Sequence, residues 1–197
     1  MCGIAGWWSP DGGPIDQAGL VRMTRALALR GPDGEGFLIE PGIGLGHRRL
    51  SIIDPAGGAQ PIANEDESVH VVFNGEIFNY LELRDALEAR GHVFRTRSDT
   101  ETLVHLYEDH GPDFVEQLNG QFAIALWDRR RRRLVLARDR VGIRPLFTAD
   151  LPDGGLLFGS EVKAILAQGR VAARLDPVAI GQGAALWAPI PPRTPFV

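Results

Sequence analysis

The chain opens with Met1-Cys2-Gly3-Ile4-Ala5-Gly6-Trp7-Trp8, and this stretch decides how the rest of the sequence is interpreted. The short apolar run from Gly3 to Trp8 is typical of a buried strand. A small residue after Met1 usually permits removal of the initiator methionine, which would expose the α-amine of Cys2. An α-amine has a pKa of about 7.7–8.0, so at neutral pH it can serve as a base beside its own thiol. The alternative is an inert, partly buried cysteine.

The remaining sequence predicts strands and helices in blocks. Strands are expected at 36–39, 42–47, 69–73, 121–127 and 134–139, with hairpin turns at 128–133 and 153–155. Helices are expected to begin at Asp16, Asn79, Ser98 and Ser160 and to end near Leu29, Gly91, Gly111 and Gly169. Adjacent hairpins favour an α+β domain of antiparallel sheets over a doubly wound parallel sheet.

Composition narrows the class of protein. The 197 residues are 44% hydrophobic, which is ordinary for a globular chain, and the net charge of −4 gives no electrostatic reason to expect nucleic acid as a partner. The arginine run 129–133 lies in a predicted turn and is interpreted as solvated. A single cysteine excludes an internal disulfide, and no His or Cys spacing predicts a metal site. With neither a signal peptide nor a long apolar run, a cytoplasmic protein without a membrane partner is expected.

Three further segments carry residues that could bind an amino acid. Arg49 stands in an apolar context, where it could clamp a carboxylate, although a surface arginine at a strand end is the commoner case. Asn74-Gly75 follows a predicted strand and could supply an oxyanion hole, although Asn-Gly is first a turn signal. Asp99 could receive a substrate ammonium group or merely serve a helix N-terminus. His47 near Cys2 is expected to be structural.

Six ordered motifs resemble those of glutamine-hydrolysing asparagine synthetases over nearly the whole chain. They are 1–6 (MCGIAG), 30–34 (RGPDG), 47–52 (HRRLSI), 74–79 (NGEIFN), 98–101 (SDTE) and 137–146 (ARDRVGIRPL). The resemblance implies a class II glutaminase domain with the N-terminal-nucleophile fold, a four-layer αββα sandwich of antiparallel sheets. That fold agrees with the α+β pattern.

The resemblance also implies a role for each matching residue. Cys2 would attack the side-chain amide of L-glutamine, and Asn74 with the Gly75 N–H would hold the oxyanion. Arg49 would bind the substrate carboxylate, and Arg48 is given no role. The remaining substrate contacts are Glu76 and Asp99 to the ammonium group and a backbone contact near Ile52.

The same resemblance implies that the glutaminase domain works with a second domain. In the family, ammonia passes to a C-terminal synthetase domain that uses ATP and Mg²⁺, and this sequence has no Ser-Gly-Gly-x-Asp-Ser loop for pyrophosphate. We therefore expect a glutaminase domain over 1–185, without a cofactor of its own, and a Pro-rich linker over 186–197 toward an absent synthetase domain. The expected partners are L-glutamine and that domain, with a homodimer as a further expectation.

Other functions remain open at this point. Glucosamine-phosphate synthase and the purine amidotransferase share the glutaminase type but differ from Arg49-Leu50-Ser51-Ile52. β-Lactam synthetases and peptide cyclases are nearer, and in some of them the glutaminase is inactive. A degenerate module that only docks a synthetase would bind or pack without turnover. Retention of Cys2, Asn74, Gly75 and Asp99 favours an active enzyme.

Overall fold

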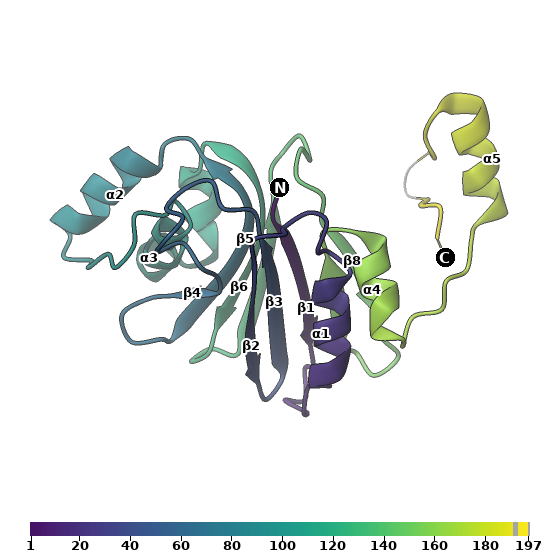
Figure 1. Ribbon diagram of the computed structural model, residues 1–197, viewed down its shortest axis with the longest axis horizontal. Coiled ribbons are helices and arrows are strands. Elements are labelled where there is room, and N and C mark those ends of the chain that lie inside the picture. The colour runs from purple at the N-terminus through teal and green to yellow at the C-terminus, as the bar shows by residue number, and fades with distance from the viewer. Residues whose placement is uncertain (191–192, 197) are drawn as a thin grey trace.

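The computed structural model describes residues 1–190 and 193–196, and its central feature is a pair of antiparallel sheets that face each other (Figure 1). The first sheet has the strand order β2-β3-β1-β9-β8, so the N-terminal strand lies at its centre. Its strands are β1 (Gly3–Trp8), β2 (Gly34–Glu40), β3 (Ile43–Arg49), β8 (Phe147–Asp150) and β9 (Leu156–Gly159). Strand β1 is hydrogen-bonded on both edges, by β3 and by β9, which fixes the position of the residue that precedes it.

The second sheet has the order β4-β5-β6-β7. Its strands are β4 (Ile62–Ala63), β5 (Val69–Ile77), β6 (Gly120–Asp128) and β7 (Arg133–Arg138). The β6–β7 hairpin lies where the alternation of the sequence predicts it. Strand β5 continues through Asn74 and Gly75, which lie opposite Ala123 and Phe122 of β6.

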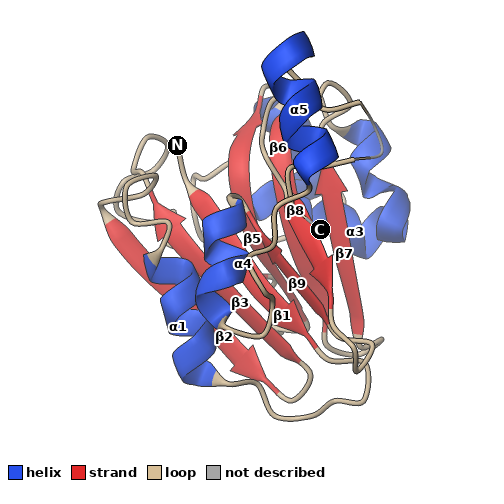
Figure 2. Cartoon of the chain, turned by 90° about the vertical axis from the view of Figure 1, so that its right-hand side faces the viewer, coloured by secondary structure: helices blue, strands red, loops and turns tan. Residues whose placement is uncertain are grey.

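Helices cover the outer face of each sheet (Figure 2). Helices α1 (Gln17–Arg25) and α4 (Val162–Gln168) pack together on the first sheet. Helices α2 (Tyr80–Ala89) and α3 (Glu101–His110), with the 3₁₀ turn η1 (Gly111–Gln117), cover the second sheet. Helix α5 (Pro177–Leu186) follows α4 and lies to one side of the sheets in Figure 1.

Three separate apolar layers hold these elements together. The layer between the sheets is built from Ile4, Ile43, Leu45, Val72, Ala123, Ala125, Trp127 and Phe158. A second layer, with Met23, Leu27 and Ile165, joins the first sheet to α1 and α4. A third, with Phe73, Leu103 and Phe114, joins the other sheet to α3 and η1. Helix, sheet, sheet and helix are thus stacked, which confirms the predicted four-layer αββα sandwich.

Several predicted boundaries were wrong for local reasons. Helix α1 ends at Arg25 rather than Leu29, because the chain from Ala26 to Arg30 tightens into turns. Ser160 does not cap α4; its hydroxyl instead accepts a hydrogen bond from the Ile4 N–H at 2.9 Å, and Glu161 takes the N-cap position.

The two expected capping boxes are also used differently. Asn79 precedes α2, but its side chain contacts the backbone of Asn119 and Gln117 instead of capping the helix. Helix α3 begins after Thr100, and the hydroxyl of Ser98 accepts from the Thr100 N–H at 3.2 Å. The side chain before α2 therefore joins a distant segment, whereas the one before α3 makes a local turn.

The C-terminal region carries an element that was not predicted. Asp176 caps α5 by accepting from the N–H groups of Val178 and Ala179. The predicted linker over 186–197 stays a prediction, and its residues 191, 192 and 197 lie outside the described residues. Within 1–190 and 193–196, no helix combines the length and apolar character needed to cross a bilayer.

Candidate active site

One pocket collects every residue that the sequence singled out for glutamine chemistry. Its walls come from the N-terminus, the end of β3 with the loop after it, the end of β5, and the segment that leads into α3. The predicted residues in the wall are Cys2, Arg49, Ile52, Asn74, Gly75, Glu76 and Asp99. Segments up to about a hundred positions apart in the sequence thus converge because β1, β3 and β5 lie next to one another across the two sheets.

Cys2 enters this pocket immediately before the central strand β1. Its Sγ lies 3.4 Å from the Leu50 N–H and 3.6 Å from the Leu50 carbonyl oxygen, so the backbone after β3 holds the sulfur in place. The side chain is partly exposed, as a nucleophile that meets a substrate must be. Met1 also lines the pocket, and its Sδ contacts the guanidinium group of Arg144.

The segment 30–34 positions this nucleophile, a role that the sequence motif did not reveal. The Arg30 Nε donates to the Cys2 carbonyl at 2.9 Å, and its Nη1 pairs with Glu161 at 3.2 Å. A Cβ on Gly31 would lie 2.3 Å from the backbone of Arg48, so only glycine permits this close approach. The Asp33 carboxylate accepts from the Ser51 N–H at 2.7 Å and ties down the loop after β3.

Asn74 presents an unused hydrogen-bond donor to the pocket. The residue is 1% exposed, and its Nδ2 is buried without a hydrogen-bond partner among the described residues. Leaving a buried donor unsatisfied costs about 1–3 kcal/mol, so such groups are rare away from functional sites. Asn74 and Gly75 were expected at a turn after the strand; they lie within β5 instead. A Cβ on Gly75 would meet the Gln121 carbonyl oxygen at 2.1 Å.

Arg49 is held by its own loop. Its Nη1 donates to the Pro55 carbonyl at 2.9 Å, and its Nη2 donates to the Ile53 and Asp54 carbonyls at 3.3 and 2.6 Å. A guanidinium group has five N–H donors, so two remain for a ligand. Ile52, in the same loop, is 74% exposed and lies in the pocket wall.

Two carboxylates, Glu76 and Asp99, also line the pocket. Asp99 is 4% exposed, and its Oδ2 accepts from the Ile77 N–H at 3.0 Å. Burial raises the pKa of Asp99, and the negative charge of nearby Glu76 raises it further, while hydrogen bonds from Ile77, Thr100 and Ser98 act in the opposite direction. A cation between Glu76 and Asp99 would relieve this repulsion. The pair thus offers two adjacent negative groups in the pocket wall.

His47 and Arg48 do not face this chemistry. His47 is 1% exposed and lies 3.2 Å from the Phe73 carbonyl, and burial lowers its pKa to about 3. Arg48 pairs with Glu35 at 3.1 Å and donates to the Gly31 carbonyl at 2.8 Å. His47 is thus structural, as the sequence analysis expects, and Arg48, which was given no role there, joins β3 to Glu35 and Gly31.

Gln60 and Arg144 are among the pocket residues that sequence reasoning missed. Gln60 accepts from the Phe73 N–H at 2.6 Å and donates to Thr100 at 3.3 Å, and so joins two walls of the pocket. Arg144 reaches the pocket from a loop built around Asp139, whose carboxylate accepts from the N–H groups of Ile143 and Arg144. The motif 137–146 gave a signal for this loop but none for its direction.

Known proteins have sequences similar to that of this chain. Residues 1–196 match a family described as "Glutamine amidotransferase domain". The chain is 41% identical over 198 residues to the glutamine-hydrolyzing asparagine synthetase 3 of Bacillus subtilis, covering 99% of this chain and 32% of that protein. It is 43% identical over 166 residues to asparagine synthetase 3 of Arabidopsis thaliana, covering 84% of this chain and 28% of that protein. The chain thus spans about a third of the length of these relatives.

Solved structures support the fold. The glutamine phosphoribosylpyrophosphate amidotransferase of B. subtilis superposes with a TM-score of 0.73 at 22% identity, covering 90% of this chain and 46% of that one. A structure described as the allosteric regulatory enzyme of purine biosynthesis gives a TM-score of 0.72 at 23% identity, with the same coverage. At this level of identity the likeness concerns the sandwich of sheets and helices.

Proposed function

Because the chain belongs to the glutamine amidotransferase domain family, we propose that it hydrolyses L-glutamine to glutamate and ammonia through a thioester on Cys2. The observation that carries the proposal is the unpartnered Asn74 Nδ2, which lies in the wall of the same pocket as the Cys2 thiol. A free donor beside a nucleophile is the arrangement that stabilises a developing oxyanion.

The chemistry requires removal of Met1, so that the α-amine of Cys2 becomes available as a base. The Cys2 Sγ attacks the side-chain carbonyl carbon of glutamine while the α-amine takes the thiol proton. Asn74 Nδ2 and the Gly75 N–H hold the oxyanion, and the α-amine passes its proton to the departing nitrogen, which leaves as ammonia. Water then attacks the thioester carbon, releases glutamate and restores the thiol.

The rest of the pocket is suited to the other end of the substrate. The two remaining donors of Arg49 would bind the α-carboxylate, and Glu76 with Asp99 would hold the α-ammonium group. The Ile52 backbone would complete the contacts. With both a positive group and negative groups in its wall, the pocket would select an amino acid zwitterion over a simple amide.

The similarity to asparagine synthetases supports a proposal for the reaction that uses the ammonia. We propose that it serves an ATP-dependent amidation of aspartate to asparagine by a C-terminal synthetase domain, as in a glutamine-hydrolysing asparagine synthetase. ATP and Mg²⁺ belong to that half of the reaction, and the hydrolysis step needs neither. A cytoplasmic location and pairing of two copies as a homodimer remain proposals.

Intact mass, the N-terminal residue and ammonia release from glutamine, measured on one sample, test the hydrolysis. Removal of Met1 with steady ammonia release is expected. Cys2→Ala should abolish release, and Asn74→Ala should lower kcat by about 10²–10³-fold. Asn119→Ala removes an exposed asparagine outside this pocket and should change neither value. Turnover with Met1 still attached would refute the role of the Cys2 α-amine as the base. A chain that has lost Met1 but releases no ammonia would refute the proposal that this domain hydrolyses glutamine by itself.

A further inference from the structure

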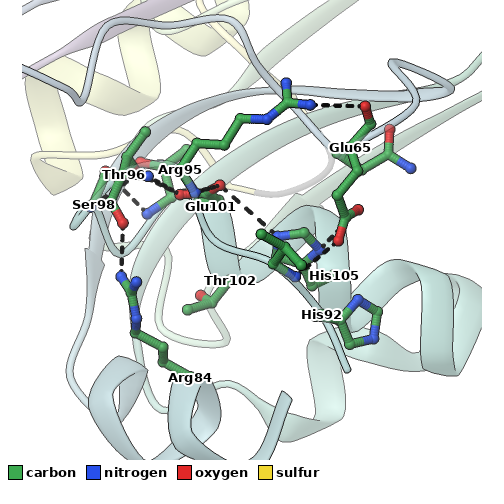
Figure 3. Close-up of polar contacts among 12 residues, drawn as sticks. Glu65, Arg84, His92, Arg95, Thr96, Ser98, Glu101, Thr102 and His105 are labelled. Atoms are coloured by element: carbon green, nitrogen blue, oxygen red, sulfur yellow. Dashed lines mark hydrogen bonds and ion pairs between the residues drawn. The ribbon is translucent and has the colours of Figure 1, made fainter. Parts of the chain in front are cut away.

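A second cluster of chemically active side chains lies on the outer side of the second sheet, away from Cys2. It consists of Glu65 in the turn after β4, His92 in the connection after α2, and His105 and Glu108 on α3. One ligand atom from each of the four side chains lies within 4.8 Å of every other. Figure 3 shows Glu65, His92 and His105 converging from these different segments.

The spacing of these atoms suits a small tetrahedral ion. The His105 Nδ1 lies 3.2 Å from the Glu108 Oε2 and 3.6 Å from the Glu65 Oε2, and the His92 Nδ1 lies 3.6 Å from the Glu108 Oε2. Zn²⁺ with bonds of about 2.0–2.1 Å places its ligand atoms about 3.3 Å apart, so small movements would suffice to seat the ion. Two imidazoles and two carboxylates are also a donor set that Zn²⁺ accepts.

Three of the four ligand side chains are also held by a hydrogen bond to the atom that faces away from the centre. The Glu65 Oε1 accepts from the Val93 N–H at 2.9 Å, and the Glu108 Oε1 accepts from Asn64 Nδ2 at 2.7 Å. The His92 Nε2 contacts the Asp109 carboxylate at 3.1 Å. The His105 Nε2 is buried 3.9 Å from Glu101 and has no hydrogen-bond partner among the described residues. Carboxylates behind metal-binding histidines fix the tautomer and the ring orientation, and His92 with Asp109 has this arrangement.

We propose that Glu65, His92, His105 and Glu108 form a structural binding site for a divalent transition-metal ion, with Zn²⁺ as the best match. The two carboxylates balance the charge of the ion, and four protein ligands leave no open position, which is typical of a structural site. The ion would fasten the connection between α2 and α3 to the turn after β4. The ligands come from three segments, so no short His or Cys spacing announces the site in the sequence.

The first test is zinc binding by chain that has been stripped of metal with a chelator. It is done in the Cys2→Ala background, which removes the thiol as a competing ligand and leaves the cluster intact. Equilibrium dialysis should give one zinc per chain, and X-ray absorption should show nitrogen and oxygen ligands only. Co²⁺ should give the intense visible bands of a tetrahedral ion. Dialysed protein that retains neither ion would overturn the proposal and would make the cluster an ion-pair network of protonated histidines.

Matched variants locate the ion. Glu65→Gln and His92→Gln change partly exposed ligands, so the fold should survive. Each variant should lower zinc affinity by more than about 100-fold, because loss of a ligand costs more than the 10–100-fold typical of losing a residue that only supports a ligand. Asp109→Asn should cost about 10–100-fold. His110→Gln removes the exposed histidine at the end of α3 and should leave affinity unchanged. Unchanged affinity in both ligand variants, or binding of Ca²⁺ and Mg²⁺ alone, would overturn the assignment.

Discussion

Mild acid should destabilise the protein through His47, a residue of the interior rather than of the pocket chemistry. Burial lowers the pKa of His47 from 6.5 to about 3; the Phe73 carbonyl opposes this shift, and the positive charges of Arg49 and Arg48 add to it. The folded protein therefore keeps the imidazole neutral at pH 5, whereas the unfolded chain protonates it. Because the unfolded state binds more protons, the free energy of unfolding falls as pH falls from 6.5 toward 3.

The size of this effect depends little on how low the folded pKa lies. At pH 5 the folded imidazole is neutral for any pKa well below that pH, so the cost is set by protonation of the unfolded side chain. At pH 5 the pH is about 1.5 units below the pKa of the unfolded imidazole. Protonation then stabilises the unfolded state by about 2 kcal/mol, since each unit corresponds to about 1.4 kcal/mol. Between pH 7 and pH 5, His47 should thus remove about 2 kcal/mol from the free energy of unfolding.

Urea unfolding at pH 7 and pH 5, in the unchanged chain and in His47→Gln, measures this contribution. Glutamine can still donate to the Phe73 carbonyl but does not titrate. The variant is allowed to be less stable at both pH values, because only the change between them matters. That change should be about 2 kcal/mol smaller in the variant. His110→Gln controls for the loss of an imidazole. An equal loss of stability in His47→Gln and in the unchanged chain would refute the reasoning.

Three further predictions concern the pocket. Arg49→Ala should raise the KM for glutamine by at least about 30-fold, or ~2 kcal/mol, because it removes the carboxylate clamp; an unchanged KM in steady-state kinetics would place the clamp elsewhere. Asp99→Asn should raise the melting temperature at pH 7, because burial raises the pKa of Asp99 and keeping the buried carboxyl group ionised costs stability; a lower melting temperature would contradict this. The same variant should raise the KM, because asparagine lacks the negative charge that would hold the ammonium group. Gly75→Ala should cost about 1–3 kcal/mol in urea unfolding, since its Cβ would overlap the Gln121 carbonyl, whereas Gly181→Ala, with nothing within 4 Å, should cost none.

Local patterns were sufficient to predict most of the strands but neither the short strand β4 nor the use of every polar residue. The alternation on either side of 128–133 predicted the β6–β7 hairpin, and the apolar run at Gly3 predicted the central strand. Ser160 was misread, because a serine before a helix looks the same in sequence whether it caps the helix or bonds to a distant strand. Asp176 followed by Pro177 was a clear helix start that the proline-rich context obscured.

In the candidate site, too, some residues could be predicted from the sequence and others could not. The residues that would touch substrate could be named because their chemistry is recognisable in short motifs. The residues that position them could not, because Arg30 acts on the Cys2 carbonyl through a contact spanning 28 positions. The Asn74 amide illustrates a third limit. Its lack of a partner is a property of the folded interior, and a sequence cannot show that a donor is unused.

The position of Cys2 directly before the central strand has a practical consequence for anyone who produces this protein. Strand β1 is paired along both edges, so residues added before Cys2 cannot be taken up by the sheet and must run through the pocket that Met1 already lines. A purification tag at this end would therefore occupy the space for glutamine and would mask the α-amine. The tag belongs after α5, which lies well to the side of the sandwich in Figure 1.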